Sequence, residues 1–65
     1  MYKKYAAVRD QRGMNDLAVA NAAEIPQSTL YDWKQRSVQK EDAEISTSAL
    51  LRIANVLEVP IEELI

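Results

Sequence analysis

Pro26 and Pro60, the only two prolines, fix the places where helices in this chain can end. A residue before a proline is pushed out of the α conformation, and proline itself is tolerated only in the first turn of a helix. Both prolines follow an acidic and a β-branched residue, as Glu-Ile-Pro at residues 24–26 and as Glu-Val-Pro at residues 58–60. Each tripeptide is therefore a predicted joint at which one helix ends and the next begins. The flanking segments do not otherwise align, so they do not indicate a tandem repeat.

Helix-start and helix-stop residues predict five helical segments in all. Gly13, the only glycine, suits the left-handed position that follows a first helix. Asn15 and Ser46 are of the type that caps a helix N-terminus, and Asp16 adds negative charge at the positive end of the second helix. The expected helices run from about Lys3 to Arg12, from Asp16 to Ala23, from Pro26 or Gln27 to Gln35, from Thr47 to Leu57, and from Ile61 to Ile65.

Apolar residues that recur at the helical period indicate which faces pack into a core. The fifth helix is short, so its apolar residues pack on the first and fourth helices or form part of a dimer seam. Without cysteine or histidine there is no disulfide or metal cage, and helix packing has to hold the fold. The apolar sets are Leu30 and Trp33, with Ile25 at the joint; Leu50, Ile53, Ala54 and Leu57; and Ile61, Leu64 and Ile65.

The charge is distributed unevenly along the chain. The net charge of −2 argues against nucleic-acid binding, because contacts to phosphates need lysine and arginine. Residues 1–40, however, carry seven bases against four acids, and residues 41–65 carry one base against six acids. This distribution predicts either a molecule with a basic face on one side and an acidic face on the other, or ordinary solvated surfaces without a function in binding. Residues 37–45 combine mixed charge with the acidic cluster of residues 41–44 and are predicted to be a surface connection.

Several classes of protein are not expected from this sequence. No apolar run approaches the roughly 20 residues of a membrane span, and the N-terminus leads into charge, so we expect a soluble, cytoplasmic protein. An enzyme is not expected, because there is no His or Cys, no Gly-rich phosphate loop, and no pocket around the loop carboxylates. We likewise expect no metal, no cofactor and no small-molecule substrate.

The stretch from Val19 to Trp33 closely resembles the helix-turn-helix of the lambda-repressor-like (Cro/XRE-type) family. Two short helices that cross steeply need a small residue where they come closest, here Ala20. They also need apolar residues around it that fill the space between the two helices. The resemblance extends to Tyr5, Val8 and Arg9 in the first helix, to Gly13 and Met14 at the first joint, and to residues 50–65. It implies an all-α, five-helix DNA-binding domain over residues 1–65, with the helix-turn-helix at about residues 15–35.

The resemblance also implies that the start of the third helix enters the major groove of double-stranded DNA, and that the N-terminus of the second abuts a phosphate. Gln27, Ser28 and Asp32 fall on base-facing positions, and Tyr31 lies beside them. Glutamine suits adenine, because its amide both accepts from the amino group and donates to the ring nitrogen. Asp32 accepts from a cytosine amino group, or it excludes wrong sequences. The expected backbone contacts are Asn15, Asp16, Thr29, Lys34, Gln35, Arg36 and Lys40.

The chain departs from the family's usual pattern at several positions. Glu24 and Glu58 replace turn glycines, so each joint either holds a non-glycine residue at positive φ, at roughly 1 kcal/mol, or uses another geometry. Asp16 replaces a glutamine that commonly touches phosphate, which puts a contact from its own side chain in doubt. Lys34 replaces a glutamate that often pairs with the helix-1 arginine, so Arg9 must find another acid or solvent. The longer acidic loop at residues 37–45 is either inert, since long surface loops cost little, or functional.

Two hypotheses of function follow from these observations. The first is a transcriptional regulator of phage or mobile-element type, a repressor that works as a homodimer on a pseudo-palindromic operator, because two copies one DNA turn apart read two half-sites. The second is a protein-interaction module, such as an antitoxin-like or anti-repressor partner, that keeps the fold without the DNA. The acidic half of the chain and Asp16 motivate the second hypothesis.

Overall fold

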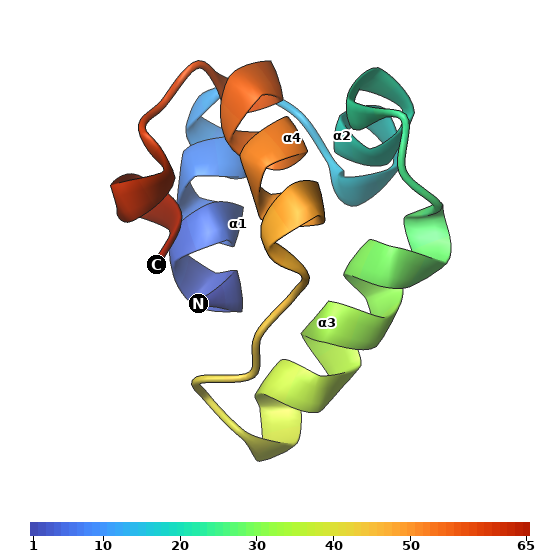
Figure 1. The fold of residues 1–65 in the computed structure, drawn as a ribbon, viewed down its shortest axis with the longest axis vertical. Helices are drawn as coiled ribbons and strands as arrows, with labels where there is room; N and C mark the ends of the chain where they lie inside the picture. Colours follow the sequence, from blue (N-terminus) through green and yellow to red (C-terminus); the bar gives the residue numbers. More distant parts are fainter.

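The computed structural model describes residues 1–65 and contains only helices and their connections. Its elements are α1 (Tyr2–Gln11), α2 (Asp16–Ala23), α3 (Gln27–Gln39), α4 (Thr47–Leu57) and a 3-10 helix, η1 (Ile61–Leu64) (Figure 1). The all-α fold class is confirmed, and the predicted bounds of α2 and α4 are matched. None of these helices has the length and apolar character that crossing a lipid bilayer requires.

Side-chain caps set the starts of two helices, as predicted. The Asn15 side chain accepts a hydrogen bond from the backbone N–H of Ala18 at 2.8 Å. The Ser46 hydroxyl accepts one from the backbone N–H of Ala49 at 3.2 Å. Each cap satisfies a donor that the first turn of a helix leaves without a partner. Gly13 has φ +68°, the left-handed conformation expected of it after α1.

The two proline joints share one backbone geometry. Glu24 and Glu58 both lie in the left-handed region at φ 57°. Each joint therefore holds a non-glycine residue at positive φ, which is one of the two geometries expected from the sequence. In each joint the residue after the glutamate closes the helix: the N–H of Ile25 donates to Ala20 at 3.0 Å, and that of Val59 donates to the carbonyl of Ala54 at 3.1 Å. These bonds satisfy carbonyls at the helix C-terminus despite the strained residue.

We expect Glu58→Gly to stabilise the fold by about 0.5–1 kcal/mol, because glycine adopts positive φ without the steric conflict of a Cβ atom. The matched control is Glu58→Ala, which removes the same carboxylate but keeps the Cβ atom and the strain. Urea denaturation of the three proteins gives the comparison. A Glu58→Gly variant no more stable than Glu58→Ala would contradict strain at this joint.

The third helix is four residues longer than predicted. It was expected to end at Gln35, and it continues to Gln39. Residues 36–39 contain neither proline nor glycine, and an ion pair between Arg36 and Asp32 at 2.8 Å, one turn apart, supports the added turn. Arg36, Val38 and Gln39 are exposed, so the added turn is a solvated part of the helix rather than a loop.

The connection between α3 and α4 is exposed except at Ala43 and, in part, Ile45, and residues 37–39 of the predicted surface connection belong to α3 instead. Ala43 is buried, and its carbonyl accepts a hydrogen bond from the Trp33 indole N–H at 2.9 Å. The terminal amine of Met1 donates to the carbonyl of Glu41 at 3.2 Å. Glu41, Asp42 and Glu44 are exposed, as is Lys40, so the acidic cluster lies on the outer side of a segment that is anchored at Ala43.

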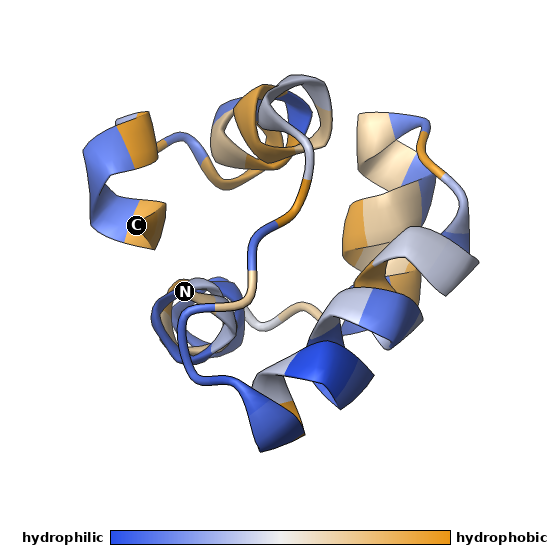
Figure 2. Ribbon diagram, turned by 60° about the horizontal axis from the view of Figure 1, so that its bottom comes forward, coloured by the Kyte–Doolittle hydropathy of each residue, from blue (hydrophilic) through white to orange (hydrophobic).

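The core takes side chains from all five elements and from the loop, with α2 packed on α3 and α4, and α1 packed on α3 and η1. Figure 2 shows α2 and α4 as more apolar than α3, whose outer side is hydrophilic. Three aromatic rings form the centre: Tyr2, Tyr5 and Trp33 have pairwise centroid distances of 5.3 Å. Leu64 of η1 is fully buried, and η1 packs on α1 and α4, one of the two roles predicted for it.

Candidate nucleic-acid interface

The phase of α3 divides its first two turns into an inner and an outer side. Leu30 and Trp33 are fully buried, which confirms their predicted place in the core. The side chains between them point outwards because helical residues three and four apart share a face. The exposed residues of this outer side include Gln27, Ser28, Tyr31 and Asp32, the four predicted base contacts.

The angle between α2 and α3 depends on small and β-branched residues at their contact. Ala20 is fully buried, and so is the neighbouring Val19. The left-handed Glu24 then turns the chain, and Pro26 caps α3 with φ −62°, ready for the first helical turn. The result is two helices joined by a short turn (Figure 1), and Pro26, Gln27 and Ser28 at the N-terminus of the longer helix are exposed.

Residues 7–65 match the family model of the Cro/C1-type HTH DNA-binding domain. The chain belongs to this family. A search of curated proteins and a search of solved structures found no match. The family is one of DNA-binding domains, and the helix-turn-helix of this Cro/C1-type domain consists of α2, the turn at residues 24–26, and α3.

At the N-terminus of α2, the Asp16 carboxylate turns towards α1. It accepts hydrogen bonds from the hydroxyls of Tyr2 at 2.7 Å and Tyr5 at 2.6 Å, and from the Arg9 guanidinium at 2.7 Å. Burial by itself would raise the pKa of Asp16, but the hydrogen bonds from Tyr5, Arg9 and Tyr2 outweigh it and hold the pKa below its ordinary value. Of the two alternatives expected for Arg9, another acid or solvent, the structure has the first, with Asp16 as the acid.

The Asp16 network also changes the tyrosines. Burial, and then the hydrogen bond to Asp16, raises the pKa of the Tyr5 hydroxyl far above its ordinary range, so this group remains a donor. Burial, and then the hydrogen bond to Asp16, also raises the pKa of the Tyr2 hydroxyl above its ordinary value. The remaining Arg9 donors bind Asp10 at 2.9–3.0 Å. One cation and two carboxylates therefore stand beside this helix end, which gives a phosphate little attraction here.

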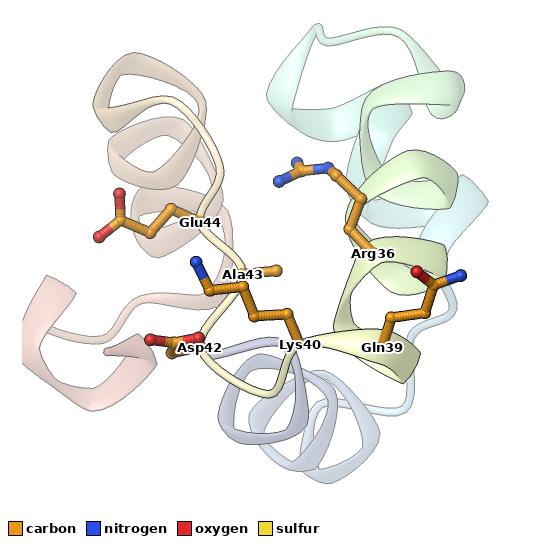
Figure 3. Close-up of a pocket in the computed structure, with 6 residues that line it drawn as sticks. All are labelled: Arg36, Gln39, Lys40, Asp42, Ala43 and Glu44. Carbon is orange, nitrogen blue, oxygen red and sulfur yellow. The ribbon is translucent and has the colours of Figure 1, made fainter.

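The predicted backbone-contacting residues lie along α3 and at its C-terminus. Lys34, Gln35 and Arg36 are exposed, and so is Lys40, which directly follows the last residue of the helix. Arg36 and Lys40 line an open hollow of about 530 Å³ between α3 and the loop, together with Gln39, Asp42, Ala43 and Glu44. In Figure 3, Arg36 reaches from α3 towards the loop, whereas Glu44 extends away from α3.

The remaining two predicted backbone contacts are Asn15 at the start of α2 and Thr29 on α3. Asn15 uses its side-chain oxygen to cap α2, which leaves its amide nitrogen for a phosphate. Thr29 is only partly exposed. The burial of Tyr2 and the ion pair between Asp32 and Arg36 were not predicted from the sequence. The three-residue spacing of Tyr2 and Tyr5 and the four-residue spacing of Asp32 and Arg36 were the available signals.

Proposed function

We propose that this Cro/C1-type domain is a sequence-specific transcriptional regulator, a repressor of phage or mobile-element type that acts in the cytoplasm. It inserts the first turns of α3 into the major groove and binds as a homodimer to a pseudo-palindromic operator. The observation that carries the proposal is the outer side of α3, where a glutamine, a serine and a tyrosine are exposed at the start of a helix whose inner side is fixed in the core. Selection from a random DNA library tests it, and a palindromic consensus is the expected result.

Gln27→Ala should remove sequence preference at one base pair in each half-site. A bidentate contact from the glutamine amide to adenine contributes about 1–3 kcal/mol of discrimination. Because Gln27 is exposed, the fold and low-salt binding to random DNA should be unchanged. Binding of both proteins to operators altered one pair at a time measures the effect.

Gln35→Ala is the matched control, because it removes the same exposed side chain two turns later on the same helix. It should weaken binding to all operators alike. If the Gln27→Ala variant ranks every operator as the parent does, Gln27 does not read a base.

Neutralising Lys34, Arg36 or Lys40 should weaken binding to every DNA sequence equally. Each contact to a phosphate releases counterions, so each loss should reduce the slope of log affinity against log salt by about one. Lys4→Gln is the control, because Lys4 lies on α1 and donates to the carbonyl of Ile65 at 2.6 Å. Salt titrations with random and operator DNA make the comparison. An altered sequence preference with an unchanged slope would contradict this assignment.

The second candidate is a protein-interaction module that retains the fold. The surplus of carboxylates at the N-terminus of α2 favours it, since an acidic helix end does not attract phosphate. Titration with random duplex DNA at low salt separates the two candidates. A DNA-binding regulator binds random duplex DNA at low salt and loses affinity steeply as salt is added, whereas an interaction module does not bind the DNA.

A further inference from the structure

The outer side of α3 contains a hollow that Gln27, Ser28 and Tyr31 line together. It has a volume of about 370 Å³ and opens to solvent. The Tyr31 ring is its large apolar element, and 63% of this residue is exposed. The hydroxyls of the other two tyrosines bind Asp16, whereas Tyr31 stands apart from that network. An exposed aromatic ring beside a polar amide is suited to a ligand that is apolar at one edge and polar at the next.

We propose that this hollow receives the C5-methyl group of a pyrimidine in the major groove, next to the adenine that Gln27 binds. This inference rests on the proposed function. The C5-methyl of thymine is the apolar group that an unmodified base pair presents in the major groove, and apolar side chains recognise it by contact. 5-Methylcytosine carries the same group at the same position. The hollow therefore suits a pyrimidine that carries a C5-methyl group, whether thymine or 5-methylcytosine.

The spacing of the lining residues sets where the methyl group lies. Gln27 and Tyr31 are one helical turn apart, which is about 6 Å along the helix axis. Successive base pairs are about 3.4 Å apart. The methyl group consequently belongs to the base pair that Gln27 reads or to a pair within two steps of it.

The other outward residue of this turn does not compete for the hollow. Asp32 is paired with Arg36 at 2.8 Å and does not line the hollow. The carboxylate, which would be poorly solvated beside a methyl group, is held along the helix by its cation. Tyr31 is therefore the specificity-determining residue that we assign to this site.

The experiment uses the DNA sequence that the parent protein selects from a random library. Each thymine in a half-site is replaced singly by deoxyuracil, which removes only the methyl group. Burial of one methyl is expected to change affinity roughly fourfold. At one thymine, in the base pair that Gln27 reads or within two steps of it, this loss of affinity should appear with the parent and with Tyr31→Phe, which keeps the ring. It should not appear with Tyr31→Ala. At that pair, 5-methylcytosine should bind roughly fourfold tighter than cytosine, again only where the ring is present.

The outcomes separate this inference from the function on which it rests. If no sequence is selected, the proposed function fails, and the methyl site fails with it. If a sequence is selected but removing a methyl group within two base pairs of the pair that Gln27 reads does not weaken binding, only the methyl site is overturned. The same holds if Tyr31→Ala shows the full loss, since the ring then makes no contact with the methyl group.

Discussion

Trp33→Ala should unfold this domain or leave it barely stable. The Trp33 side chain is fully buried against Tyr2 and Tyr5, and its indole N–H donates to the Ala43 carbonyl at 2.9 Å. Truncating a large buried aromatic costs about 3–5 kcal/mol, and the total stability of so small a domain is only about 5 kcal/mol. Thermal melts followed by circular dichroism measure the loss.

Trp33→Phe is the matched variant, because it keeps an aromatic ring and removes the hydrogen bond. The buried carbonyl of Ala43 then lacks its donor, and we expect a loss of about 1–3 kcal/mol, well short of unfolding. A Trp33→Ala variant that melts within a few degrees of the parent would contradict both the phase of α3 and the anchoring of the loop.

Asp16→Ala should destabilise the fold by about 2–3 kcal/mol, because hydrogen bonds to a charged acceptor are strong and the donors are left partly buried without it. Three donors lose their acceptor at once: the hydroxyls of Tyr2 and Tyr5 and the Arg9 guanidinium. Asp10→Ala is the control. Its side chain also pairs with Arg9 but is 67% exposed, so its removal should cost about 0–1 kcal/mol. Urea denaturation at neutral pH distinguishes the two, and equal losses would contradict the role of the network.

The same carboxylate should make stability depend on pH in the acidic range. The folded state lowers the pKa of Asp16, so below about pH 4 the unfolded state takes up this proton first. The contribution of Asp16 to the free energy of unfolding is thus fully present above the ordinary carboxyl pKa. It is lost as the pH falls through the pKa that Asp16 has in the folded state. The difference in unfolding free energy between the parent and Asp16→Ala should shrink over that interval. A difference that stays constant down to low pH would rule out the ionised carboxylate as the acceptor.

Local chemistry in the sequence was enough to predict the order of the helical segments, the bounds of α2 and α4, and the inner side of the helix-turn-helix. Proline excludes the α conformation from the residue before it, and a capping side chain reaches only three residues along the chain. The ends of α2 and the whole of α4 follow from such signals. The burial of Leu30 and Trp33 follows from the helical period. The family resemblance rested on the same short-range pattern, and the family match over residues 7–65 agrees with it.

The tertiary structure alone decided the partners of the polar groups. Asp16 was expected near a phosphate, and its carboxylate instead joins Tyr2, Tyr5 and Arg9, which lie on a different helix. The buried loop carbonyl that binds Trp33 is another such contact. Helix propensity is determined over a few neighbouring residues, whereas these contacts form only after α1, α2 and the loop have packed around one aromatic cluster. The sequence specifies which side chains can hydrogen-bond, and the packing of the helices specifies which of them meet.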